Sequence, residues 1–131
     1  PVYDLIASLI CHGLFDRVPN LKVATVELGA GWVGDLSRRL KRSYGKTPQL
    51  YKRDPLDTFH DHVWVAPFYE DDVSNIRDLI GADRMLLGSD WPHPEGLASP
   101  YEWAADFASI TPAERRMCLR DNMRALSGFP L

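Results

Sequence analysis

The stretch Arg84-Met85-Leu86-Leu87-Gly88-Ser89-Asp90-Trp91-Pro92-His93 decides how this chain is interpreted. Its apolar run, Met85–Leu87, is short and bounded by turn residues, which is typical of a buried strand in a parallel sheet. The prolines on either side of His93 lack backbone donors, so the strand is expected to end at Asp90. Ligands of α/β proteins gather at the carboxyl ends of such strands, which makes Asp90 and His93 candidate site residues. Asp90 could equally cap a loop or pair with a basic side chain.

Two earlier stretches have the same buried, apolar character. Leu21–Val26 is rich in β-branched residues and is followed by Glu27, and Val63–Phe68 is too apolar for a half-exposed strand. Apolar spacing and glycine or proline signals predict helices over Val2–His12, from Trp32 to Gly45, over Val73–Ile80, and from Pro100 and Pro112 onward. This alternation predicts one α/β domain over residues 1–131, with Leu21–Val26, Val63–Phe68 and Arg84–Ser89 as adjacent parallel strands in that order.

Several details of the helices can be predicted from single residues. Ser99–Glu102 and Thr111–Glu114 both have the pattern of a capping box with proline at the first helical position. Asn122 falls in the apolar stripe of the last helix, where a buried amide needs backbone partners, so we expect it to hold a neighbouring loop. Cys11 and Cys118 lie in apolar helical patterns and are interpreted as small buried side chains without a disulfide.

Composition excludes several classes of protein. The net charge is −3 and no long basic block is present, so a nucleic-acid partner is not expected. The local cluster Arg38–Arg42 is interpreted as the solvated face of a helix. No apolar run approaches the roughly 20 residues of a membrane span, and no signal peptide is recognisable, so we expect a cytoplasmic protein without a membrane partner. The chain begins at Pro1 rather than methionine, which suggests a piece of a longer protein.

Four segments together resemble the amidohydrolase-related family: Phe15–Val23, Glu27–Trp32, Gly88–His93 and Asp121–Leu126. That family consists of metal-dependent TIM-barrel hydrolases and includes aminocarboxymuconate-semialdehyde decarboxylase and related decarboxylases. The resemblance implies a partial (β/α) TIM-type barrel of about three parallel strands, which correspond to strands six, seven and eight. The chain would then be the C-terminal part of a barrel that needs about 250 residues when complete.

The resemblance also implies roles for individual residues. Asp90 matches the family's metal-binding aspartate, which is also catalytic, and His93 matches a histidine often found in the same turn. Glu27 stands where the family carries an acid–base histidine, and a carboxylate there could shuttle a proton, bind metal or mark a lost activity. We expect Trp32 and Trp91, together with His93, to line a substrate-binding cleft.

The remaining histidines do not supply the other ligands of the family. Its His-x-His pair on strand one and its strand-five histidine have no counterpart here, and only His60 and His62 share that spacing. Because these two precede a strand, we expect them on the surface at the opposite rim of the sheet.

Three functions are compatible with these residues. We favour the C-terminal part of a metal-dependent hydrolase or decarboxylase that acts on a small carboxylic or cyclic substrate, and we expect this part to be inactive by itself. The expected cofactor is a divalent metal ion, with zinc favoured, although this chain by itself could also bind none. The second is a non-catalytic half-barrel that serves as a structural or binding module. The third is a metal-free enzyme in which Glu27 and Asp90 act as paired carboxylates. Two open sheet edges further predict a homodimer, or completion by another barrel half.

Overall fold

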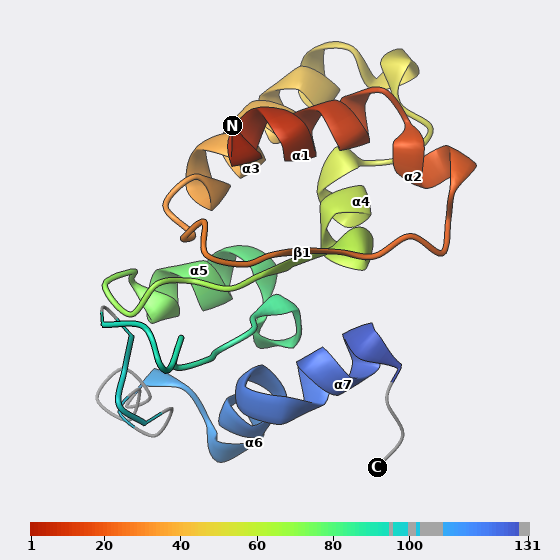
Figure 1. Ribbon diagram of the computed structural model, residues 1–131. Coiled ribbons are helices and arrows are strands. Elements are labelled where there is room, and N and C mark those ends of the chain that lie inside the picture. The colour runs from red at the N-terminus through yellow and green to blue at the C-terminus, as the bar shows by residue number, and fades with distance from the viewer. Residues whose placement is uncertain (95, 100–101, 103–108, 129–131) are drawn as a thin grey trace.

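The computed structural model describes residues 1–94, 96–99, 102 and 109–128 (Figure 1). The elements are α1 (Val2–Cys11), α2 (Leu14–Arg17), β1 (Val23–Thr25), α3 (Val33–Lys46), η1 (Pro48–Leu50), α4 (Pro55–His62), β2 (Val63–Val65), α5 (Val73–Ile80), η2 (Ala82–Arg84), α6 (Pro112–Arg116), the π-helical η4 (Met117–Asp121) and α7 (Asn122–Ser127). In the view of Figure 1, α1 to α4 lie above the strands, and α6 and α7 lie below them.

The sheet has two parallel strands and one further extended segment. β1 pairs with β2 in the register Val23↔Val63 to Thr25↔Val65. The segment that follows η2 adds a single parallel bridge, Val65↔Met85, and the Leu86 N–H donates to the Val65 carbonyl at 2.9 Å. The predicted order and parallel direction are therefore confirmed, whereas the third strand is reduced to this one bridge.

The ladders are short because backbone donors beyond them bond elsewhere. The Ala66 N–H still donates to the Thr25 carbonyl at 2.9 Å, but Pro67 has no N–H and the Phe68 N–H donates to the Asp71 carboxylate. The observed strands are consequently shorter than the predicted ones at their carboxyl ends. A partial barrel is not established by two strands and a bridge.

The hydrophobic core lies between the strands and the helices on both sides. Buried apolar side chains come from α1, α3, α5, β2 and the Met85 segment, among them Ile6, Leu36, Ile76, Val65 and Met85. The predicted amphipathic helices over Val2–His12 and Val73–Ile80 are confirmed, the first ending one residue early at Cys11, and α3 continues one residue past Gly45 to Lys46. Burial of its apolar face stabilises each of these helices.

The C-terminal helical run covers the outer side of the Met85 segment. The Asn122 amide donates to the carbonyls of Ala82 at 2.8 Å and Met85 at 2.7 Å, while the Leu87 N–H donates to the Cys118 carbonyl at 2.9 Å. We call Asn122 and Cys118, with the carbonyls they contact, the C-terminal anchor. Asn122 thus holds a neighbouring loop, as predicted, and this edge of the sheet is not open, contrary to expectation. β1 is an edge strand, and the homodimer remains a prediction.

The two cysteines differ. Cys118 is buried, its thiol contacts the Ala82 carbonyl at 3.3 Å, and burial raises the pKa of that thiol to about 11. Cys11 is exposed, so its expected burial is wrong. It is the last residue of α1, and the buried side chains of that helix are those of Ile6 and Ile10. Both thiols are free.

The capping box at Thr111 is confirmed, since the Thr111 hydroxyl accepts from the Glu114 N–H at 3.2 Å and the Glu114 carboxylate accepts from the Thr111 N–H at 2.7 Å.

The helix predicted to begin at Pro100 lies outside the described residues. None of the described helices combines the length and the apolar character that crossing a bilayer requires.

Candidate metal centre at the carboxyl ends of the strands

Three polar side chains converge where the strands end. Glu27, Asp90 and His93 each offer a ligand atom, and these atoms all lie within 4.8 Å of one another. The His93 Nδ1 is 3.5 Å from an Asp90 carboxylate oxygen. We call these residues the rim cluster. Glu27 and His93 are 66 positions apart in the sequence, and the structure brings them together with Asp90, as expected. The chemical roles of the three residues remain predictions.

The backbone at this rim is strained at two of the three residues. Glu27 and Asp90 both have φ of 57°, in the left-handed region that residues other than glycine rarely adopt and that aspartate tolerates better than glutamate does. Strain of this kind persists only where surrounding contacts enforce it, and it is concentrated at functional sites. Both strained residues immediately follow an extended segment that ends at the rim.

The turn that carries Asp90 and His93 is closed by its own backbone. The His93 N–H donates to the Asp90 carbonyl at 3.0 Å, and the Leu97 N–H donates to the Ser89 carbonyl at 2.7 Å. A Cβ at Gly96 would lie 2.7 Å from the Ser89 carbonyl oxygen, so only glycine allows this close approach. The turn therefore presents Asp90 and His93 side by side.

Asp71 connects the loops that follow β1 and β2. One of its carboxylate oxygens accepts from the Ala30 N–H and from the Phe68 N–H, each at 2.8 Å. The neighbouring Asp72 caps α5 by accepting from the Asn75 N–H at 3.0 Å. Asp71 instead fixes the loop of Glu27 against the neighbouring loop. Nothing in the sequence distinguished it within an acidic run.

A pocket of about 390 Å³ opens beside the rim cluster. Its walls come from the ends of all three extended segments and include all three cluster residues: Val26, Glu27, Ala66, Pro67, Phe68, Tyr69, Glu70, Gly88, Ser89, Asp90, His93, Gly96 and Leu97. The described wall does not include Trp32 or Trp91, so their place in a substrate-binding cleft remains a prediction. Phe68 and Tyr69, which the sequence interpretation missed, provide the aromatic surface instead.

The two tryptophans have other surroundings. The Trp32 indole N–H donates to the Gly29 carbonyl at 2.9 Å, and its ring packs edge-on against Phe59 with centroids 6.2 Å apart. Trp32 thus holds the loop after β1 to the helical layer. Trp91 is 71% exposed and projects from the turn. Their predicted contact with substrate stays untested.

The rim cluster fits a divalent metal ion in its donor chemistry. Ions such as Zn²⁺ bind nitrogen and carboxylate oxygen at roughly 2.0–2.2 Å, so two donors on one ion lie at most about 4.4 Å apart. The present spread of up to 4.8 Å needs only a small side-chain rotation. Two carboxylates and one imidazole suit zinc or manganese. All three residues are exposed, so most of any coordination sphere would face water or another part of the protein.

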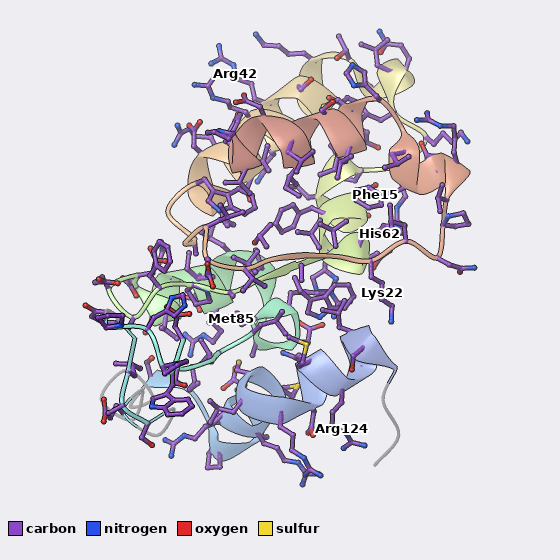
Figure 2. All side chains as sticks on the ribbon, viewed as in Figure 1. Phe15, Lys22, Arg42, His62, Met85 and Arg124 are labelled. Carbon is purple, nitrogen blue, oxygen red and sulfur yellow. The ribbon has the colours of Figure 1, made fainter. Side chains whose placement is uncertain are left out.

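The His60–His62 pair lies at the start of β2, at the opposite end of that strand. His60 stands between Asp61, at 3.8 Å, and Asp83, at 3.4 Å. His62 is half-buried rather than a surface residue: its Nδ1 is 2.8 Å from the Leu21 carbonyl oxygen, and its ring stacks on Phe15 with centroids 4.5 Å apart (Figure 2). These contacts give His62 a packing role.

Comparison with known proteins decides the family. A model of the family described as amidohydrolase matches residues 2–129. The chain belongs to the amidohydrolase family. Its α/β fold is similar to that of solved family members: an amidohydrolase from Mycobacterium avium subsp. paratuberculosis matches with a TM-score of 0.89 and 42% identity, over 95% of this chain and 33% of that chain.

Decarboxylases are among the relatives. A γ-resorcylate decarboxylase from Rhodococcus jostii is 31% identical over 90% of this chain and 37% of its own length. A dihydroxybenzoic acid decarboxylase from Polaromonas, solved with bound manganese and the inhibitor 2-nitroresorcinol, matches with a TM-score of 0.68 and 26% identity, over 95% of this chain and 39% of that chain. The chain thus spans about a third of the length of the curated relatives it matches.

Proposed function

We propose that this chain forms the C-terminal part of a metal-dependent decarboxylase of the amidohydrolase family, acting on a small cyclic or aromatic carboxylate. The observation that carries the proposal is the convergence of Glu27, Asp90 and His93 beside a pocket with an aromatic wall. The manganese in the Polaromonas structure supports a divalent cofactor, with zinc as the other candidate.

Each residue of the site has a distinct role in this proposal. Asp90 and His93 hold the ion from one turn, and Glu27 adds a third donor from the neighbouring loop and can pass a proton at the edge of the pocket. A bound divalent ion would supply Lewis-acid stabilisation of negative charge on a substrate oxygen. Phe68 and Tyr69 orient the ring of the substrate and keep water from one side of it, because they form the aromatic part of the pocket wall.

We further propose that the chain has little turnover by itself. The rim cluster supplies three exposed ligands, whereas a catalytic site also needs walls that exclude water, and the matched relatives are about three times as long. The remaining strands of a barrel, or a second copy of the chain, would provide those walls next to the free edge of β1.

A non-catalytic half-barrel is the second candidate, favoured by one observation. Glu27 occupies the position at which the family resemblance implies a histidine, so the acid–base group of the family is replaced. Such a module would keep the fold and the pocket but would bind a ligand without converting it.

Metal binding by the purified chain tests the proposal. We expect calorimetric titration with Mn²⁺ and with Zn²⁺ to show one site, and Asp90→Asn to weaken it at least about tenfold, as loss of a metal ligand should. Asp78→Asn removes another exposed carboxylate, that of the Arg77 ion pair on α5, and should leave the metal affinity unchanged. Binding that is absent, or equal in all three proteins, would contradict the metal site.

A decarboxylation assay with a dihydroxybenzoate and added Mn²⁺ then separates the two candidates. We expect turnover by the isolated chain to be at the detection limit. Strong metal-dependent turnover that disappears in Asp90→Ala would show that the chain is a catalyst on its own and would contradict the proposed inactivity.

A further inference from the structure

A second pocket, of about 300 Å³, lies at the opposite end of the strands from the rim cluster. It is formed where α1 ends, where α2 begins, and where the chain passes from η1 into α4. In Figure 1 the α1–α2 connection lies at the upper right, whereas the turn after the Met85 segment lies at the lower left. The two pockets share no lining residue among those described.

The rim of this pocket is positively charged. Arg17, Lys52 and Arg53 line it, against the single carboxylate of Asp16. Arg17 and Arg53 also have local partners, since Arg17 donates to the His12 carbonyl at 2.6 Å and Arg53 pairs with Asp61 at 2.7 Å.

Lys52 differs from the two arginines. In the described part of the chain its ammonium group has no hydrogen-bond or ion-pair partner, although it stands in the pocket wall. An anion in the pocket would therefore meet one cation, Lys52, whose charge no carboxylate in the described part of the chain compensates.

The base and the lip of the same pocket are apolar. Ile10 and Phe15 line it and are only 5% and 2% exposed, so they form a packed base. Leu50 lies at the lip and is 72% exposed, the highest value among the large apolar side chains described. A ligand with an apolar body would remove Leu50 from water, which burial of apolar area favours by about 25 cal/mol per Å².

We propose that this pocket binds a small amphipathic carboxylate, with its charged end toward Lys52 and its apolar body over Leu50 and Phe15. Its volume is at the lower end of the range of roughly 300–1,000 Å³ for ligand pockets, which limits the ligand to a compact molecule. Guanidinium and ammonium groups on one rim recognise a carboxylate, while the apolar base disfavours a fully hydrated ion such as phosphate. The proposal does not depend on the metal site.

The chain contains its own reporter of this site. Cys11 is exposed and lines the pocket, with its sulfur 3.8 Å from the Tyr51 hydroxyl, whereas the other thiol, Cys118, is buried. An uncharged alkylating reagent such as N-ethylmaleimide should therefore modify Cys11 in the folded protein. Occupancy of the pocket should slow this reaction by blocking access to the sulfur.

The experiment measures the alkylation rate of the full chain with and without benzoate, up to about 5 mM. We expect benzoate to slow Cys11 alkylation at least threefold in a saturable way, and neither benzyl alcohol nor inorganic phosphate to do so. Protection of Cys11 by benzyl alcohol as strong as that by benzoate would show a purely apolar pocket. Protection by phosphate as strong as that by benzoate would show a non-specific effect of charge. Either result, like no protection at all, would overturn the proposal.

Two variants localise the effect. Lys52→Gln should reduce the benzoate affinity at least fivefold, and Leu50→Ser should reduce it severalfold, each judged from the ratio of rates with and without benzoate. Lys41→Gln, which removes an exposed cation of α3 outside the pocket, is the matched control and should change nothing. Protection that persists unchanged in Lys52→Gln would place the anion elsewhere.

Discussion

The C-terminal anchor and the rim cluster are both small polar groups at the Met85 segment, and their environments are opposite. In the anchor, Asn122 is 6% exposed and both of its amide hydrogens go to backbone carbonyls, at 2.8 and 2.7 Å. In the rim cluster all three side chains are exposed, two of them stand on left-handed backbone, and the His93 Nδ1 is 3.5 Å from an Asp90 carboxylate oxygen.

This difference shows what each group contributes to the folded state. A buried amide with its hydrogens paired stabilises one arrangement of helix and loop, because any other arrangement leaves carbonyls without partners. Exposed carboxylates with strained backbone contribute little stability and remain free to bind something else. Substitutions in the two groups should therefore differ widely in their effect on the free energy of unfolding.

Asn122→Ala should have the largest effect. It leaves the buried carbonyls of Ala82 and Met85 without the amide, so we expect the free energy of unfolding to fall by about 2–4 kcal/mol. Urea denaturation followed by circular dichroism measures the change. Asn75→Ala, at an exposed position in α5, is the control and should stay within about 0.5 kcal/mol of the unchanged chain. A similar small loss in both variants would mean that the anchor is not a stabilising contact.

Asp71→Ala should rank second and should affect both stability and the site. The N–H groups of Ala30 and Phe68 lose a charged acceptor but can turn to water, so we expect a loss of about 1–2 kcal/mol. Because the loop of Glu27 is no longer fixed, Mn²⁺ affinity should fall severalfold in the same titration as above. Asp71→Asn keeps an acceptor oxygen, so its stability and its Mn²⁺ affinity should lie between those of the unchanged chain and those of Asp71→Ala. An unchanged Mn²⁺ affinity in Asp71→Ala would reduce Asp71 to a purely structural residue.

Glu27→Gly should act in the opposite direction. Glycine removes the cost of the left-handed backbone, which exceeds its own entropic cost, so stability should rise by about 0.5–1 kcal/mol. Metal binding should weaken at the same time, since a donor is lost. Glu70→Gly, on the wall of the same pocket but without positive φ, should not stabilise the chain. Stabilisation by neither change would argue against stored strain at Glu27.

Asp90→Asn should have the smallest effect on stability. Asparagine adopts the left-handed region as readily as aspartate, and the ion pair with His93 is exposed, so the free energy of unfolding should change by less than about 0.5 kcal/mol. The same variant should lose metal affinity at least about tenfold. A loss of stability comparable to that of Asn122→Ala would erase the contrast between anchor and rim cluster.

The sequence alone determined the features that depend on neighbours along the chain. Apolar spacing placed α1 and α5, the Thr111–Glu114 pattern specified its capping box, and the β-branched runs located β1 and β2. It also indicated that Glu27, Asp90 and His93 meet, because residues after parallel strands share one edge of the sheet.

The tertiary structure decided what depends on contacts between distant residues. Asp71 resembles its acidic neighbours in the sequence, and only its position between two loops lets one oxygen accept from Ala30 and Phe68. The third strand is reduced to one bridge with β2, and on its other side the Leu87 N–H donates to the Cys118 carbonyl of the helical run. Trp32 turned to Gly29 and Phe59 rather than to the pocket. The hydrogen-bond partner of a backbone N–H and the packing partner of a large ring depend on which distant residues the fold brings near them, and the local sequence does not specify those residues.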